Sequence, residues 1–187
     1  MPQHSRFKVT VARLALLFSV CFLPSLAPAQ DRSHSMTDAE IEQVRELSYQ
    51  PNDRVALFQK FLDQRIADIQ KINAAKRVND RENLLHDLMD QFSALADELD
   101  DNLDDYQQKH WDVRKALRKL AEDSGKWAAI LNQPPPDPAY NVTRKLALEA
   151  ATDIHDSAQK VLEDQTAWFA AHPPVKEEEK GPVIIPR

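Results

Sequence analysis

The chain has 187 residues, the size of one ordinary domain, and only two of them are glycine. Hairpins and phosphate-binding loops use glycine for backbone conformations with positive φ, so this composition argues against an all-β fold and a nucleotide-binding fold. The 30 acidic and 24 basic residues give a formal net charge of −6, which disfavours nucleic acid and anionic membranes as general partners.

Residues 1–29 have the pattern of a secretory signal peptide. Basic residues precede a ten-residue, largely apolar run at 14–23, and Ala-Pro-Ala at 27–29 matches a small-x-small cleavage site. As a helix the run would be only ~15 Å long, about half of a ~30 Å hydrocarbon core, so a lasting transmembrane anchor is the weaker interpretation. We therefore predict a secreted or periplasmic bacterial protein that begins at Gln30 and keeps no transmembrane anchor.

Cleavage at that site would change the chemistry of the chain. Cys21 is the one cysteine and lies in the removed segment, so the mature protein would have no disulfide, thiol nucleophile or thiolate metal site. Loss of Arg6, Lys8 and Arg13 would change the net charge from −6 to −9.

The first helix is predicted to follow a polar, flexible leader at 30–36. Thr37 and Glu40 have the spacing of a capping box, in which each side chain accepts a hydrogen bond from the other's backbone. A short apolar stripe follows, and Pro51 is expected to end the helix.

A second helix is predicted from Asn52, which we expect to act as its N-cap. The helical pattern fades through residues 73–78, and Asn79 and Asp80 are typical of a turn with a new N-cap. Its apolar residues have helical spacing: Val55, Phe58, Phe61, Leu62, Ile66, Ile69 and Ile72.

The most regular pattern in the chain lies at residues 85–131, where apolar residues recur in steps of three and four. His110 and Ser124 are the polar positions in this series. The apolar members are Leu85, Leu88, Phe92, Leu95, Leu99, Leu103, Tyr106, Val113, Leu117, Leu120, Trp127 and Leu131. We expect one unbroken helix at 80–132, about 80 Å long, ended by the prolines at 134–136. The alternative is a break near 100–105, where two steps of four make a stutter.

A last helix is predicted with Asp137 as N-cap and Pro138 in the first turn. Its alanine-rich seam runs to Trp168, and the prolines after His172 end it. Residues 37–172 would thus form one helical domain, followed by a charged, proline-containing tail at 173–187 that we expect to be disordered.

These elements predict an all-α fold. We favour an elongated, antiparallel, coiled-coil-like three-helix bundle in which the long helix is the spine. A compact four-helix bundle with that helix broken in two is the alternative.

The densest charge cluster is acidic and lies at residues 97–105. The favoured interpretation is a solvated helix face, because the acids point away from the apolar seam. The alternative is a weak divalent-cation site, although the glycine and terminal glutamate of an EF-hand are missing. The candidate ligands are Asp97, Asp100, Asp101, Asp104 and Asp105.

The candidate partner-binding residues are Trp111, Arg114, Lys115 and Arg118, which follow the acidic cluster. Tryptophan among guanidinium groups can bind anions, sugars or an aromatic partner, and packing of Trp111 under the first helix is the competing interpretation. The opposite charges of the two stretches also suggest an antiparallel homodimer, with charge pairing inside one chain as the alternative.

No catalytic or cofactor motif is present. The serines have no glycine-containing strand–turn–helix context, and no Glu-x-x-His pair indicates a metal-binding bundle. We therefore predict a non-enzymatic protein without cofactor that binds or scaffolds an unidentified protein or other component of the cell envelope.

Overall fold

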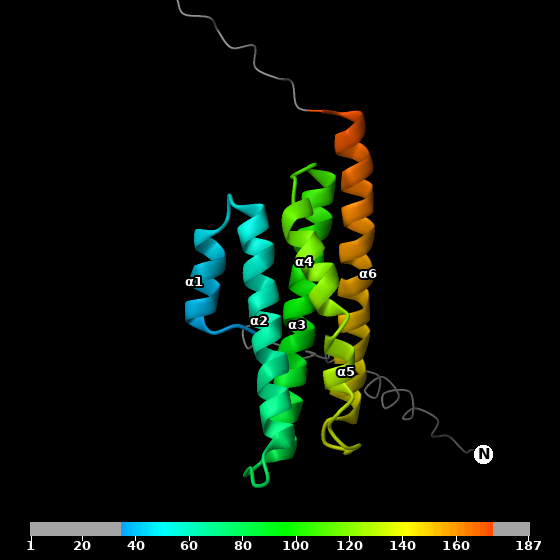
Figure 1. The fold of residues 1–187 in the computed structure, drawn as a ribbon. Coiled ribbons are helices and arrows are strands. Elements are labelled where there is room, and N and C mark those ends of the chain that lie inside the picture. The colour runs from blue at the N-terminus through cyan, green and yellow to red at the C-terminus, as the bar shows by residue number, and fades with distance from the viewer. Residues whose placement is uncertain (1–34, 174–187) are drawn as a thin grey trace, which may run out of the picture. The chain divides into compact units, whose positions relative to one another are not determined.

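The computed structural model describes residues 35–173, and in this range it contains α-helices and no strand, as predicted (Figure 1). The expected signal peptide at 1–29, almost all of the leader and all but the first residue of the tail lie outside the described residues. The helices are α1 (Asp38–Glu46), α2 (Pro51–Ala74), α3 (Arg81–Gln108), α4 (Arg114–Ser124), α5 (Trp127–Leu131) and α6 (Asn141–Ala171).

The predicted capping box begins α1. The Thr37 hydroxyl accepts from the Glu40 backbone N–H at 3.3 Å, and the Glu40 carboxylate accepts from the Thr37 N–H at 2.7 Å. The helix ends at Glu46, before Pro51. Only Val44 of this helix is buried, so apolar packing alone holds α1 weakly.

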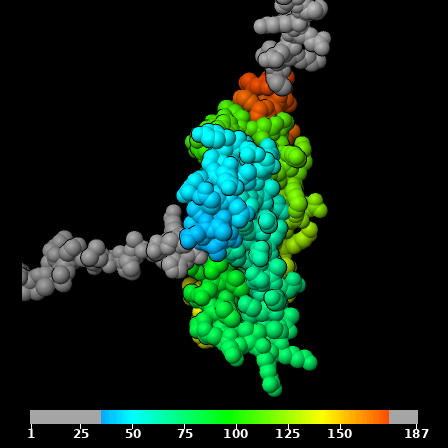
Figure 2. All heavy atoms as spheres, turned by 90° about the vertical axis from the view of Figure 1, so that its left-hand side faces the viewer, coloured from blue at the N-terminus to red at the C-terminus, as the bar shows by residue number. Residues whose placement is uncertain are grey.

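A buried arginine on α2 attaches α1 to the rest of the protein. Arg65 donates to both carboxylate oxygens of Glu40, at 2.8 and 2.9 Å, and to the Gln91 side chain of α3 at 3.0 Å. Burial raises the pKa of Glu40 and the hydrogen bonds from Arg65 and Thr37 lower it, with a net lowering. Figure 2 shows α1 on the outer surface of the helices that it contacts.

The expected N-cap of the second helix is wrong. Pro51 is the first residue of α2, where its missing N–H costs nothing, and Gln50 is the N-cap residue. Asn52 lies inside the first turn, and its side chain contacts a different helix. The predicted turn before α3 is confirmed, since Asp80 has a left-handed φ of 56°.

The single helix predicted at 80–132 is also wrong, and so is a break at 100–105. Helix α3 passes through the acidic cluster and ends at Gln108, and α4 starts at Arg114 after a sharp corner. The next interruption lies at Gly125, between α4 and α5. The predicted stop before Pro134 is confirmed, because α5 ends at Leu131.

The last helix begins later than expected. Asp137 caps a preceding turn, in which its carboxylate accepts from the Ala139 N–H at 2.8 Å. Helix α6 itself starts at Asn141.

Successive long helices alternate in direction, so that α4 runs back along the bundle after α3 (Figure 1). Helices α2 and α6 each contact both α3 and α4. The predicted apolar seam is buried throughout, except that Leu88 is partly buried, so periodicity identified the core although it missed the corner.

Candidate functional site

The corner between α3 and α4 is built by a Schellman motif. His110 has a φ of 54°, and its N–H donates to the Gln107 carbonyl at 3.2 Å. The Trp111 N–H donates to the Tyr106 carbonyl at 2.9 Å, which completes the hydrogen-bond pair of this motif. The rings of Trp111 and Tyr106 stack with centroids 5.7 Å apart, the side-chain contact that usually accompanies such a helix end.

Two amide side chains from distant helices hold the corner. Gln165 of α6 accepts from the Val113 N–H at 3.1 Å and donates to the Trp111 carbonyl at 2.9 Å. Asn52 of α2 donates to the Asp112 carbonyl at 2.7 Å and accepts from the Ala116 N–H at 3.1 Å. The N-cap residue of α4 is Val113, whose side chain has no hydrogen-bonding group. Asn52 of α2 therefore caps the first turn of α4 in its place.

The corner creates a shallow groove of about 410 Å³ at this end of the protein. Its walls include Tyr49 from the loop before α2, Pro51 from the start of α2, Trp111 from the corner and Phe169 from the end of α6, together with His110 and Asp112. Tyr49 is 92% exposed and Trp111 is 37% exposed. Large aromatic side chains are rarely left in water to this extent in a group, so these residues define a candidate binding surface.

A stack of rings supports one side of the groove. Trp168 of α6 stacks with His110 at 4.1 Å and with His172 at 4.5 Å, with interplanar angles of 9° and 17°. Its edge meets Phe169 at 4.7 Å. The stack connects the corner to the end of α6 and fixes the orientation of the Phe169 wall.

Cationic groups border the aromatic surface. The Arg114 guanidinium lies 4.5 Å from the centre of the Phe169 ring, and the Lys109 ammonium lies 5.4 Å from the Trp111 ring. Each is also paired with an acid: Arg114 with Asp112 and Lys109 with Asp105, both at 2.7 Å. The hydrogen bond from Arg114 lowers the pKa of Asp112.

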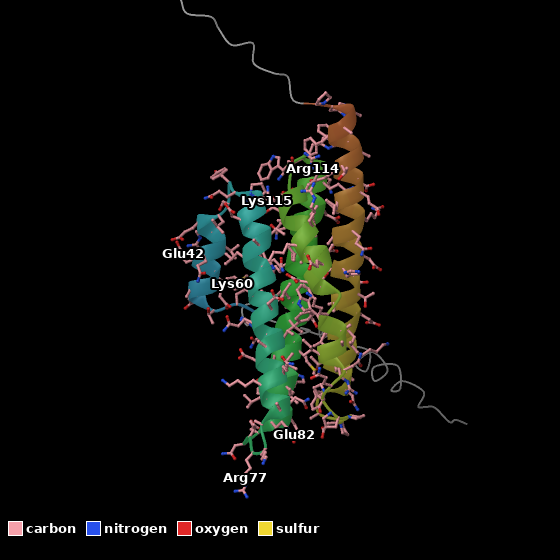
Figure 3. All side chains as sticks on the ribbon, viewed as in Figure 1. Glu42, Lys60, Arg77, Glu82, Arg114 and Lys115 are labelled. Atoms are coloured by element: carbon pink, nitrogen blue, oxygen red, sulfur yellow. The ribbon has the colours of Figure 1, made fainter. Side chains whose placement is uncertain are left out.

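The unbalanced positive charge near the groove belongs to α4. Lys115 and Arg118 are exposed, and within residues 35–173 neither forms an ion pair. Figure 3 shows Arg114 and Lys115 where α4 begins, at the end of the protein that carries the groove. A ligand in the groove would therefore meet aromatic walls, with the Arg114 guanidinium against Phe169 and the Lys109 ammonium against Trp111.

The four predicted partner-binding residues are thus split between two places. Trp111 lines the groove and Arg114 contacts its Phe169 wall, whereas Lys115 and Arg118 lie on the exposed side of α4. We expected all four on one continuous helix, but the corner separates Trp111 from the three residues on α4. Tyr49 and Phe169 were not identified from the sequence, because only the corner brings α2, α4 and α6 together.

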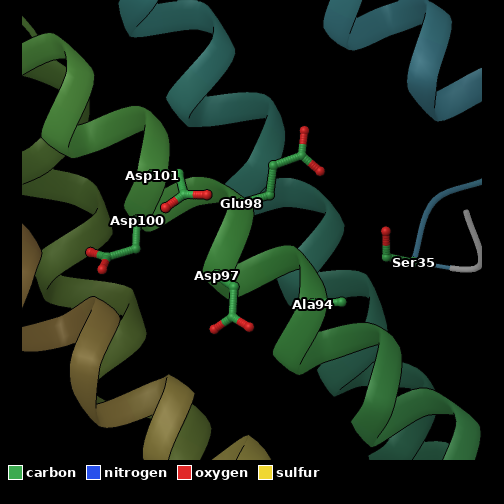
Figure 4. Close-up of a pocket in the computed structure, with 6 residues that line it drawn as sticks. All are labelled: Ser35, Ala94, Asp97, Glu98, Asp100 and Asp101. Carbon is green, nitrogen blue, oxygen red and sulfur yellow. The ribbon is translucent and has the colours of Figure 1, made fainter. Parts of the chain in front are cut away.

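The acidic cluster remains on α3 and lines a second, more enclosed pocket of about 570 Å³. Figure 4 shows the carboxyl groups of Asp97, Glu98, Asp100 and Asp101 fanning out around the helix, without a common centre. Within the described part of the chain, no group of three or more acidic, histidine or cysteine side chains is arranged to hold a metal ion.

Two members of this cluster are partly buried. One Asp100 oxygen, Oδ1, is enclosed without a hydrogen-bond partner, and burial raises the pKa of Glu98. Single oxygens in divergent directions do not make a coordination shell for calcium, which requires six to eight oxygen ligands.

A serine–histidine pair occurs elsewhere, between Ser124 and His155. Ser124 Oγ lies 3.0 Å from His155 Nδ1, within the distance expected for a nucleophile and its base. However, Ser124 is 1% exposed, and the other ring nitrogen of His155 contacts the Gln159 amide instead of a carboxylate. The contact holds the end of α4 against α6. The His155 ring also lies close to Gly125, since a Cβ at that position would be 3.4 Å from the ring.

The helices and the groove define an all-α protein with an aromatic, cation-bordered surface at one end. No protein-family model matches the chain, and no curated protein or solved structure gives a significant match. In residues 35–173, no helix combines the length and the apolar character needed to cross a bilayer.

Proposed function

We propose that this chain is a non-enzymatic protein that binds a protein partner through the aromatic groove. The observation that carries the proposal is the exposure of Tyr49 and Trp111 beside Phe169, in a groove whose corner is held by hydrogen bonds from Asn52 and Gln165. A corner that is already ordered loses little conformational freedom on binding, and aromatic residues dominate the energy of protein interfaces.

The scaffold of this surface is proposed to be a four-helix bundle. Helices α2, α3 and α6 would provide three members and the α4–α5 pair the fourth, with α1 packed outside. The contacts of both α3 and α4 with α2 and α6 support this arrangement, in which α3 and α4 lie diagonally.

The compartment is proposed from the sequence of residues 1–29. Their signal-peptide pattern supports export to the periplasm or beyond, and a partner in the bacterial envelope follows from that location. Fractionation of cells that express the full chain, with mass determination, should give a periplasmic or secreted product that begins at Gln30. A product retained in the cytoplasm at full mass would contradict export.

The partner can also be a second copy of the chain. The homodimer hypothesis placed acidic and basic stretches along one helix, but α3 carries the acids and the antiparallel α4 carries Lys115 and Arg118. Sedimentation at low salt tests self-association, and a monomer at all concentrations would remove this partner from consideration.

The binding proposal is tested by photo-crosslinking in cells. A photoreactive amino acid replaces Tyr49 in the groove, and a matched variant carries it at the exposed Gln70, toward the opposite end of α2, ~30 Å away. We expect a specific adduct from position 49 that disappears when Trp111→Ala is added. Equal adducts from both positions, or an adduct that is insensitive to Trp111→Ala, would contradict the proposal.

A further inference from the structure

The end of α6 leads the chain directly to the groove. Phe169 lines the groove, the helix ends at Ala171, and Pro173 is the last described residue. The sequence continues with residues 174–187, which therefore start beside the aromatic surface. An extended chain covers about 3.3 Å per residue, so the ten residues 174–183 span up to ~33 Å.

The composition of this segment complements the groove. Three successive glutamates occupy positions 177–179, between Lys176 and Lys180, and Pro182, Val183, Ile184, Ile185 and Pro186 follow after Gly181. Aromatic grooves accept extended proline-containing segments, because such segments lose little conformational entropy on binding. The apolar part therefore suits the surface made by Tyr49, Trp111 and Phe169.

The three glutamates form a local acidic run, although Lys176, Lys180 and Arg187 balance their charge over residues 174–187 as a whole. Lys115 and Arg118 are exposed cations without an ion pair in the described range, on the helix that begins at the corner. The glutamates at 177–179 precede the apolar residues, and Lys180 and Gly181 separate the two parts. Because the segment is tethered, its effective concentration at the groove is on the order of millimolar.

We propose that residues 177–186 of this chain bind in its own groove, with the apolar residues on Trp111 and Phe169 and the glutamates facing Lys115 and Arg118. This inference rests on the proposed function, since it takes the groove to be a binding surface. The segment competes with the external partner, so partner binding depends on its release.

The test uses the indole N–H signals of the three tryptophans in NMR spectra of the full chain, assigned by Trp→Phe variants. A stop codon in place of Val175 and the pair Ile184→Asp with Ile185→Asp each remove the proposed contact. We expect both to shift the Trp111 signal and leave that of the buried Trp127 unchanged. A synthetic peptide of residues 174–187 added to the stop variant should restore the original Trp111 signal in a saturable manner.

The matched control peptide carries lysine at positions 177–179 and should bind more weakly, with a difference that high salt reduces. An unchanged Trp111 signal in both tail variants would overturn the proposal, while the Tyr49 crosslink would still test the proposed function separately. If dilution of the full chain alone shifts the Trp111 signal, the segment binds in the groove of a second copy. That result would also overturn binding within the same chain.

Discussion

At the residue scale, the corner depends on two side chains that each satisfy two backbone groups. Gln165 is 4% exposed and forms hydrogen bonds to both sides of the Trp111–Asp112–Val113 backbone. Asn52 likewise bonds two backbone groups, the Asp112 carbonyl and the Ala116 N–H in the first turn of α4. Neighbouring solvent cannot easily replace Gln165, because the amide that it accepts from is buried.

We predict that Gln165→Ala lowers the free energy of unfolding by about 1–3 kcal/mol, since it leaves a buried donor unsatisfied. Urea denaturation measures this, with Gln64→Ala at an exposed position of α2 as the control. Addition of Asn52→Ala should cost less than the sum of the two single changes, because both hold the same corner. Fully additive losses would indicate that the two amides act independently.

The sequence predicted part of this site. Trp111 and Arg114 were recognised as surface residues with binding chemistry, because they depart from the apolar series. Asn52 and Gln165 were not recognised as corner residues, since their partners are 60 and 52 positions away along the chain. Periodicity describes which face a residue occupies on its own helix, and it carries no information on such distant contacts.

Asp123 on α4 provides a pH-dependent contact at the same scale. It accepts hydrogen bonds from Gln59 of α2, Lys119 and Lys126, and the two lysines lower its pKa to about 2. A carboxyl group whose pKa is lower in the folded state stabilises the fold above its unfolded pKa, and this stabilisation is lost as the pH falls toward 2.

We therefore predict that Asp123→Asn lowers the melting temperature at pH 7 and that the difference from the parent chain shrinks toward zero as the pH falls from about 4 to about 2. Thermal melts across that range measure it. A difference that stays constant with pH would show that the ionised form of Asp123 contributes nothing.

At the element scale, the helix at 80–132 was mispredicted for a specific reason. Tyr106 and Val113 are seven positions apart, which equals two helical turns, so the apolar series continues in step across the corner. No glycine or proline marks the reversal, because His110 adopts the left-handed conformation that glycine usually supplies. The core residues were consequently predicted well and the topology was not.

Helix α1 is the element that we expect to be released most easily. Its attachment depends on the Arg65–Glu40 pair, whose side chains are 9% and 13% exposed. We predict that Arg65→Met removes hydrogen-exchange protection from α1 while α3 and α6 keep theirs.

The control is Arg45→Met, which breaks the exposed Arg45–Glu42 pair within α1 and should cost only about 0.2–0.5 kcal/mol. If Arg65→Met left α1 protected, or if it unfolded all helices together, the buried pair would not be the specific attachment of this helix.

At the scale of the whole molecule, the acidic cluster and the exposed cations lie on different helices, α3 and α4. The acids of α3 diverge, so we predict that calcium does not raise the melting temperature of the full chain. A rise that Asp101→Asn with Asp104→Asn abolishes would instead establish the cation-binding alternative. Lys115 and Arg118 lie on α4, so the proposed partner would bring apolar groups to the groove and acidic groups to α4.

The groove exists only if the chain reverses direction at the corner, so that α4 runs back beside α2 and α6. Spin labels on the cysteines of Asn83→Cys and Ala129→Cys, in a Cys21→Ser chain, give the distance between the two positions by double electron–electron resonance. A continuous helix would separate these positions, 46 residues apart, by ~70 Å. We expect a distance well under half of that value, and a distance near ~70 Å would contradict the corner and the groove together.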